Sequence, residues 1–468
     1  GYVVLATELL AIRTLIPFVG SGTEVISIII SAVLLPLAIG YHFGGSAFKR
    51  SFQQMRESKK NQLSIRKILL RNVISALVVL SLGLSYMFQE FFFAVMNVAG
   101  ITSRLMQTAI YSVLFLSYPI FLLGQTVPLV SNYFSSTKLS DITGKMLFFS
   151  TVGSFLGSVF STIILMTYIG VHNTIIVTML LLCALVFLLM RSILCFETLL
   201  LAIILLFVFT INSDFAMRDL GVVSNNAYNL VRVIDEPEEG IKIFNVNRSS
   251  SSQLSKDPEK RFAYFAYVED NFITPAIGKY DKPLDILVIG AGGFTIGLDD
   301  TYNNYLFVDI DHDLKDVAEK HFLPEKLSAN KKFLAVCARA FVRGNDKKYD
   351  LIIVDVFTNA IAIPMECLTR EFLVDVKAML KENSIFLVNM ISSPAFNDRF
   401  AVRYHNTFTS VFPVFSRQII RVKGDHLVNF EGKKLPDKNI LYMYFNNKYV
   451  DDTGIYTDDK NSYSIDRL

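Results

Sequence analysis

The sequence has little net charge and few cysteines. Its 45 Lys and Arg residues face 42 Asp and Glu residues, a net charge of +3 in 468 residues. Such a balance gives no indication of a nucleic-acid partner. Cys183, Cys195, Cys337 and Cys367 show no Cys-x-x-Cys or other metal-ligand spacing, so we expect no metal site and unpaired thiols.

Apolar residues, in contrast, are more frequent than in an ordinary soluble protein. They make up 52% of the chain, and the mean hydropathy is +0.42. The excess is concentrated in residues 1–212, whereas residues 213–468 alternate strand-like and helix-like segments of ordinary polarity. A membrane half followed by a soluble half is therefore predicted.

Seven apolar runs in the first half approach or reach the roughly 20 residues that cross a bilayer. They cover residues 2–19, 24–42, 72–96, 105–127, 146–168, 173–190 and 194–212. The first run starts at residue 1 without a basic segment or a cleavage motif, so it is interpreted as a span and not as a signal peptide.

The loop between the second and third runs is strongly basic. Only Glu57 opposes its eight cationic residues, which are Lys49, Arg50, Arg56, Lys59, Lys60, Arg66, Lys67 and Arg71. The positive-inside rule predicts that this loop is cytoplasmic. Five further crossings would then leave the soluble half outside the cytoplasm.

Some residues within the runs have a specific expected role. Glu8 and Arg13 are costly in a bilayer, so we expect them to face the protein interior and pair, or else Arg13 to extend to the interface. Small residues around Gly153 and Gly157 predict a closely packed helix face. Pro119, together with Gly124 and Pro128, predicts a kinked or ending fourth span.

The soluble half opens with a small β-hairpin domain over residues 213–283. Strands at 228–235 and 241–247 flank an acidic turn that contains Pro237 and Gly240. A helix is expected over 261–277.

Residues 284–446 are predicted to form an α/β Rossmann-like domain, followed by a polar tail over 447–468. Uninterrupted apolar strands that alternate with helices are typical of a parallel sheet covered on both faces. The expected strands are 285–289, 305–309, 333–336, 349–355 and 384–389. One helix is expected to begin near residue 295, and two more are expected over 313–322 and 370–381. Later runs at 415–422 and 439–446 predict an antiparallel pair at the sheet edge.

The turn after the first of these strands has the layout of a nucleotide site. Gly290, Gly292 and Gly293 allow a tight turn and a close approach of a ligand to the backbone. The next strand ends at Asp309, nineteen residues after Gly290, where a carboxylate can accept hydrogen bonds from two ribose hydroxyls. The loop after the strand that ends at Asp355 should converge on the same edge.

These motifs resemble the spermidine synthase family of aminopropyltransferases over roughly 224–420. The glycine turn, residues 308–311 and residues 349–355 carry the resemblance most strongly. The segments 356–364 and 368–372 resemble the membrane-fused bacterial branch, and so do Glu8 with Arg13, Gly20 and residues 40–45.

The resemblance implies roles for the residues of the site. Asp309 would bind the ribose of the co-substrate, decarboxylated S-adenosylmethionine, with the glycine turn against its aminopropyl and sulfonium end. Asp355 would help to deprotonate the amine, or else only cap a helix. Tyr267 would contribute to the pocket or only to packing.

The remaining expected contacts complete the site. Gln253 and Tyr228 are assigned to the substrate, and Cys337 with Ala338 to the adenine end. Three of the family's acids are replaced. Gly293 is found where the family has an Asp, and Cys337 where it has the acid that binds the adenine amine. Thr358 is found where the family has a second acid after Asp355.

Two functions therefore remain open. The first is a membrane-anchored aminopropyltransferase that acts on an amine such as putrescine, without a covalently bound cofactor. The second is a catalytically degenerate fold that serves as a structural or regulatory subunit. Both imply a multi-pass protein of the bacterial inner membrane, with the lipid bilayer and a protein assembly or second copy as partners.

Overall fold

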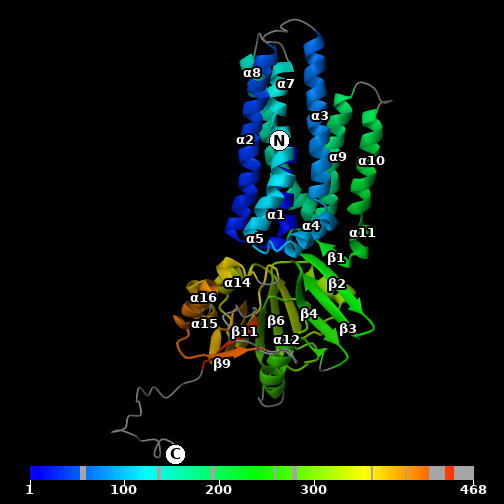
Figure 1. The fold of residues 1–468 in the computed structure, drawn as a ribbon. Coiled ribbons are helices and arrows are strands. Elements are labelled where there is room, and N and C mark those ends of the chain that lie inside the picture. The colour runs from blue at the N-terminus through cyan, green and yellow to red at the C-terminus, as the bar shows by residue number, and fades with distance from the viewer. Residues whose placement is uncertain are drawn as a thin grey trace, which may run out of the picture.

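The computed structural model describes residues 1–52, 59–133, 139–190, 196–257, 260–276, 282–359, 362–396, 398–420 and 438–446. It consists of a helical bundle above an α/β domain (Figure 1). The predictions for Cys195 and for the tail over 447–468 concern residues outside the described ranges.

The bundle is built from long helices that run side by side, away from and back toward the α/β domain (Figure 1). Its elements are α1 (Tyr2–Val19), α2 (Thr23–Phe52), α3 (Lys59–Gly83), α4 (Tyr86–Val98), α5 (Arg104–Ser112), the π-helical turn η1 (Val113–Ser117), α6 (Tyr118–Gly124), α7 (Thr126–Tyr133), α8 (Leu139–Val159), the π-helical turn η3 (Phe160–Met166), α9 (Gly170–Leu189), α10 (Phe196–Ile211) and α11 (Asp214–Asp219).

Six helices of the described residues are long and apolar enough to cross a membrane. They are Tyr2–Val19, Thr23–Gly45, Arg104–Ser131, Asp141–Met166, Gly170–Leu189 and Phe196–Asp219. A seventh would be the pair Ile65–Gly83 and Tyr86–Val98, which is bent by 70°.

The expectation of one straight span over 72–96 is therefore wrong. The run is divided between α3 and α4, and α4 lies at the end of the bundle nearest the α/β domain (Figure 1). The Glu90 carboxylate accepts hydrogen bonds from Arg232 (2.9 Å) and Arg248 (3.1 Å) of the α/β half. The bend places Glu90 beside the α/β half and gives its charge two partners, which would be favourable over burying the charge within a membrane span.

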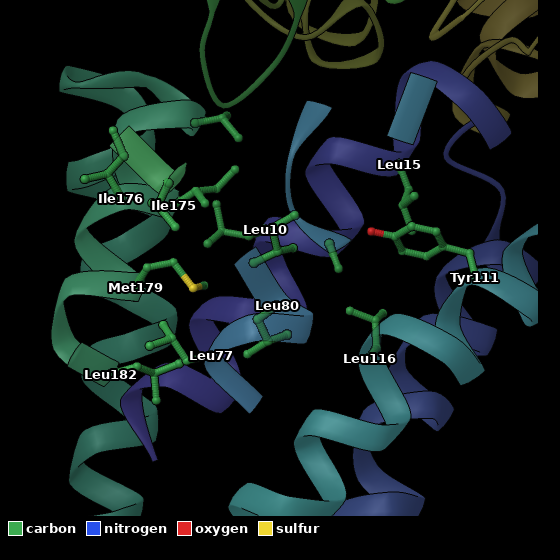
Figure 2. Close-up of a cluster of buried hydrophobic side chains, with 14 of the residues drawn as sticks. Leu10, Leu15, Leu77, Leu80, Tyr111, Leu116, Ile175, Ile176, Met179 and Leu182 are labelled. Atoms are coloured by element: carbon green, nitrogen blue, oxygen red, sulfur yellow. The ribbon is translucent and has the colours of Figure 1, made fainter. Parts of the chain in front are cut away.

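The expected close packing of α8 is present, whereas the fourth candidate span does not end at Pro119, Gly124 or Pro128 but continues to Ser131. A π-helical turn, η1, stands directly before the helix that contains Pro119, where the missing N–H disturbs the regular bonding. At Gly157 an added Cβ would lie 2.3 Å from the Tyr2 carbonyl oxygen, so the small residues let α8 approach α1 closely. Buried Leu, Ile and Met side chains of α1, α3 and α9 form the core (Figure 2).

The two ionisable residues of α1 do not pair with each other. Both Glu8 and Arg13 are buried, as expected, at 8% and 4% exposure. Arg13 donates instead from Nε to the carbonyl oxygen of Asn226 (2.8 Å). The loop after the first strand of the α/β half thus reaches into the base of the bundle.

The predicted hairpin is the middle of a four-stranded antiparallel sheet in the order β1-β2-β3-β4. Its strands are β1 (Val222–Asn225), β2 (Leu230–Glu236), β3 (Ile241–Val246) and β4 (Ser249–Ser255). The expected helix follows as α12 (Ala263–Val268), η5 (Glu269–Ile273) and η6 (Thr274–Ala276).

The second sheet has seven strands in the order β10-β11-β9-β8-β5-β6-β7. The five strands from β9 to β7 are parallel, and β11 and β10 continue the sheet antiparallel, as predicted. The elements are β5 (Asp285–Ile289), β6 (Asn304–Asp309), α13 (Leu314–His321), β7 (Lys331–Ala335), α14 (Ala338–Gly344), β8 (Tyr349–Val354), η7 (Met365–Cys367), α15 (Arg370–Ala378), β9 (Leu380–Ser392), α16 (Arg399–Thr409), β10 (Ser416–Ile419) and β11 (Lys438–Phe445).

One expected helix is missing. The helix predicted from about residue 295 is replaced by consecutive turns between β5 and β6. Phe294 has a φ of 60° and Gly297 a φ of 64°, which a right-handed helix does not allow. The Gly297 amide is instead bonded to the Glu269 carboxylate (2.9 Å).

The contact between α2 and α6 provides a test of the bundle. A Cβ at Gly40 would lie 2.4 Å from the Phe121 carbonyl oxygen and 3.0 Å from Gly124 Cα, whereas a Cβ at Gly45 of the same helix meets nothing within 4 Å. We expect Gly40→Val to destabilise the detergent-solubilised protein by about 1–3 kcal/mol, the usual cost of overpacking. Thermal unfolding would measure it, with Gly45→Val as the control. Equal shifts in both variants would contradict the close contact.

Candidate functional site

A cavity of about 310 Å³ lies at the carboxyl ends of the parallel strands. Its walls come from the glycine turn after β5, from Asp309 at the end of β6 and from the loop after β8. Ile16 and Ser21, from the last turn of α1 and the residues that follow it, close the cavity on the bundle side. The site is therefore built jointly by the α/β domain and a candidate membrane span.

The glycine turn holds two strand ends together. Gly290 has a φ of 93°, and a Cβ at this position would lie 2.1 Å from the Asp355 carbonyl oxygen. Any side chain there would push the backbone of Asp355 away. The next amide, that of Ala291, donates to Asp309 Oδ2 (3.0 Å), so the turn fixes both acids.

Asp309 is the last residue of β6 and lines the cavity. Its Oδ1 accepts from the Asp311 amide (3.2 Å), and the remaining lone pairs of the carboxylate are available to a ligand in the cavity. Burial raises the pKa of Asp309 to about 6. A nearby cation would favour the charged form.

Asp355 lies on the opposite side of the glycine turn. Its Oδ1 accepts from Asn389 Nδ2 (2.9 Å), and burial raises its pKa to about 6. A carboxylate with such a pKa is suited to accept a proton near neutral pH. No helix starts within residues 355–359, so the alternative role of Asp355 as a helix cap is wrong.

The structure brings together most of the predicted site residues. The cavity is lined by Gly290, Gly292, Asp309, Asp355, Cys337, Ala338 and Tyr228. Cys337, Cys183 and Cys367 are free thiols, as expected.

Three predicted residues lie outside the cavity wall. Gln253 donates to the Lys260 carbonyl oxygen (2.6 Å). Tyr267 packs against Phe272, with the ring centroids 6.2 Å apart. The Gly293 amide donates to Ser252 Oγ (2.9 Å), which anchors the turn to β4.

Sequence reasoning assigned no site role to Tyr264, which lies near Asp355 but outside the cavity lining, or to Glu366. Tyr264 is fully buried, its hydroxyl has no hydrogen-bond partner in the described structure, and its pKa is raised by burial and then by the charge of Asp355. It lies one helical turn before Tyr267, and that spacing was the available signal. Glu366 also lines the cavity and supplies a third carboxylate, which no motif indicated.

A hydrogen-bonded network extends from the site to the bundle. Asn226 Nδ2 donates to Asp311 Oδ1 (2.8 Å) and to Asp313 Oδ2 (2.8 Å), and Asn229 Nδ2 donates to Asp311 Oδ2 (3.0 Å). Arg13 donates to the Asn226 carbonyl oxygen, and the Asp311 amide donates to Asp309. The network therefore connects α1 to Asp309.

The same network explains the one group in the described residues whose donor atoms lie close enough for a metal. This group is Asp311, His312 and Asp313. Asn226 and Asn229 already donate to its carboxylates, so we assign no metal to it.

The strand order and the glycine turn define the C-terminal half as a Rossmann-like domain with a cavity at the carboxyl ends of its parallel strands. Residues 272–423 match the family described as Spermine/spermidine synthase domain. A polyamine aminopropyltransferase of Vibrio vulnificus (strain CMCP6) is 27% identical over 193 residues, which covers 40% of this chain and 62% of that protein. The chain thus spans less than two thirds of that curated relative.

Solved structures give matches of lower identity. A probable spermidine synthase from Corynebacterium glutamicum is 19% identical with a TM-score of 0.39, covering 51% of this chain and 82% of that one. Spermidine synthase from Thermotoga maritima is 15% identical with a TM-score of 0.36, covering 51% and 81%. Residues 272–423 are thus similar to a spermine/spermidine synthase domain, and in this chain they follow a bundle of candidate membrane spans.

The link between Arg13 and the site can be tested by amide hydrogen exchange. Asn226 Oδ1 accepts from the Tyr228 and Asn229 amides (both 2.9 Å), so loosening Asn226 should expose them. We expect Arg13→Gln to speed exchange of these amides about tenfold or more, because a bond to a charged donor is worth roughly 1.5–3 kcal/mol.

Arg66→Gln is the matched control for this experiment. Arg66 also donates to main-chain carbonyls, those of Leu189 and Met190, but through another part of the bundle. Unchanged exchange at residues 228–229 in the Arg13 variant would show that Arg13 does not hold the loop.

Proposed function

We propose that the protein is a membrane-anchored aminopropyltransferase that uses decarboxylated S-adenosylmethionine and an amine acceptor such as putrescine. The observation that carries the proposal is the shared cavity of Asp309 and Asp355, held together by the turn at Gly290. The spermine/spermidine synthase domain over residues 272–423 supports this general reaction.

The donor would bind on the Asp309 side. The Asp309 carboxylate accepts the two ribose hydroxyls, and the sulfonium is directed toward the glycine turn. Among the described residues, the cavity lining has carboxylates but no Lys or Arg, so a sulfonium or an ammonium finds only attractive charges from them.

The acceptor amine would lie between Asp355 and the donor. Its nitrogen attacks the aminopropyl carbon next to sulfur, the C–N bond forms, and the C–S bond breaks to release the neutral thioether. Asp355 accepts the proton that the amine loses, while Asn389 orients the carboxylate. Glu366 would pair with a second ammonium group of the acceptor, because Thr358 stands where the resemblance expects an acid.

The second candidate function is a degenerate subunit of a membrane assembly. Two observations favour it. Cys337 occupies the position of the adenine-binding acid. In addition, a Cβ at Gly293 would lie 2.6 Å from the Phe322 ring, which leaves no room for the acid that the family has there.

Calorimetry and turnover together test the proposed reaction. We expect Asp309→Ala to weaken binding of decarboxylated S-adenosylmethionine about tenfold or more, since two hydrogen bonds are lost. Asp355→Asn should leave this binding nearly intact and slow transfer about 10²–10⁴-fold. The wild-type rate should fall as the pH drops through about 6, where Asp355 becomes protonated.

The outcomes separate the two functions. Absence of nucleoside binding at millimolar concentration would favour the degenerate subunit. Undiminished transfer in Asp355→Asn would remove this residue from the mechanism. Unchanged donor affinity in Asp309→Ala would show that Asp309 does not bind the ribose.

The side of the membrane can be tested separately. The end of α2 and the start of α3, which flank the basic loop, lie at the end of the bundle far from the α/β domain (Figure 1). With α3 counted as a span, five crossings separate this loop from residue 213, so the positive-inside rule favours an extracytoplasmic α/β domain.

We therefore expect a membrane-impermeant thiol reagent to label an introduced Lys348→Cys in intact cells, since residue 348 is exposed. A Lys67→Cys variant next to the basic loop is the control for the opposite side. Labelling of residue 348 would support the second function, because the donor nucleoside is expected in the cytoplasm. Labelling only after lysis would reverse the orientation and favour the enzyme.

A further inference from the structure

A second cavity, of about 750 Å³, lies where the bundle meets the four-stranded sheet. It is bounded by the start of α9, by α11 directly after the last candidate span, by strands of the small sheet and by the end of α13. Neither the cavity nor its residues take part in the proposed reaction.

Cationic side chains converge on this cavity from three elements. Arg218 comes from α11, Lys242 from β3, and Lys320 and His321 from α13. Burial and then the charges of Lys320, Lys242 and Arg218 lower the pKa of His321, so the groups are close enough to repel one another. Over the described ranges, none of the four forms a salt bridge.

The two acids of the cavity neutralise this group only in part. Asp214 Oδ1 is bonded to His172 Nε2 (2.7 Å) and its charge also acts on Arg218, while the exposed Asp235 lies opposite Lys242 across β2 and β3. Three bases, Arg218, Lys242 and Lys320, against two acids leave a positive excess, and an anionic ligand would relieve the remaining repulsion.

The position of the cavity indicates the source of the anion. The candidate span Phe196–Asp219 contains Arg218 itself. At the same end of the bundle, Tyr168 and Phe215 are 81% and 80% exposed. Exposed aromatic residues at the ends of spans mark the level of the lipid headgroups. Basic side chains at this level bind anionic lipids.

We propose that this cavity binds the phosphate headgroup of an anionic phospholipid. Arg218, Lys242 and Lys320 would hold the phosphate oxygens, and the acyl chains would extend along the bundle beside α9 and α10. The cavity also includes Asn225, whose Oδ1 accepts from Arg13 (3.4 Å), so a bound lipid would support the loop that holds the first site.

The test uses the full chain in detergent, titrated with phosphatidylglycerol and followed by native mass spectrometry. Each basic residue near a headgroup contributes about fivefold in affinity. The triple variant Arg218→Gln, Lys242→Gln, Lys320→Gln should therefore bind the lipid about a hundredfold more weakly. Phosphatidylcholine should bind weakly to the wild type and to the variants.

A matched triple variant controls for net charge. Lys326→Gln, Arg343→Gln, Lys348→Gln removes three exposed bases outside the cavity and should keep wild-type affinity. If the first triple variant does not fold, the single variants Lys320→Gln and Lys242→Gln should each lose about fivefold.

Two results would overturn the proposal. One is a lipid affinity of the cavity triple variant, or of both single variants, that equals the affinity of the control variant. The other is displacement of phosphatidylglycerol by an equal concentration of inorganic phosphate or glycerol phosphate, which would identify a soluble anion as the ligand. Retention of the lipid against millimolar phosphate supports the headgroup assignment.

Discussion

The hydrogen bond from Arg13 to the Asn226 carbonyl is the constraint on which the arrangement of the two halves depends. A guanidinium buried in α1 cannot be left without a partner, because an unpaired charge of this kind costs several kcal/mol. The loop that contains Asn226 must therefore stay seated in the bundle. The same loop binds Asp311, whose amide bonds Asp309. The bundle consequently acts as a wall and a support of the site, and not only as an anchor.

The charge of the cavity follows from this construction. In the described part of the chain, Asp309, Asp355 and Glu366 line the cavity and no Lys or Arg does. Burial raises the pKa of Asp309 and of Asp355 to about 6, so part of their charge is lost just below neutrality when the cavity holds no cation. A cationic donor or acceptor reverses that tendency, since opposite charge favours ionisation. Ligand binding and deprotonation of the two acids are thus expected to support each other.

Much of the α/β domain could be predicted because buried strands are continuous apolar runs and parallel strands end at one edge. That rule correctly grouped Asp309 and Asp355 with the glycine turn. The prediction from apolar runs failed where a tertiary contact, and not the local sequence pattern, determined the backbone conformation. The Glu269 carboxylate accepts a hydrogen bond from the Gly297 amide in the segment where a helix was expected. The third span is bent where Glu90 forms ion pairs with two arginines. The cavity residue Glu366 and the buried Tyr264 were missed because their neighbours come from distant segments that no local period reveals.

The replacement of a family acid by Gly293 is built into the surrounding core. The space that a side chain would need is filled by Phe322, which is fully buried and packs against Phe244 with tilted rings whose centroids are 5.1 Å apart. The amide of Gly293 is at the same time committed to Ser252 Oγ. Restoring an acid at this position alone would overpack the core and break that anchor. The glycine turn, β4 and the residue that follows α13 therefore fit together around a glycine at position 293.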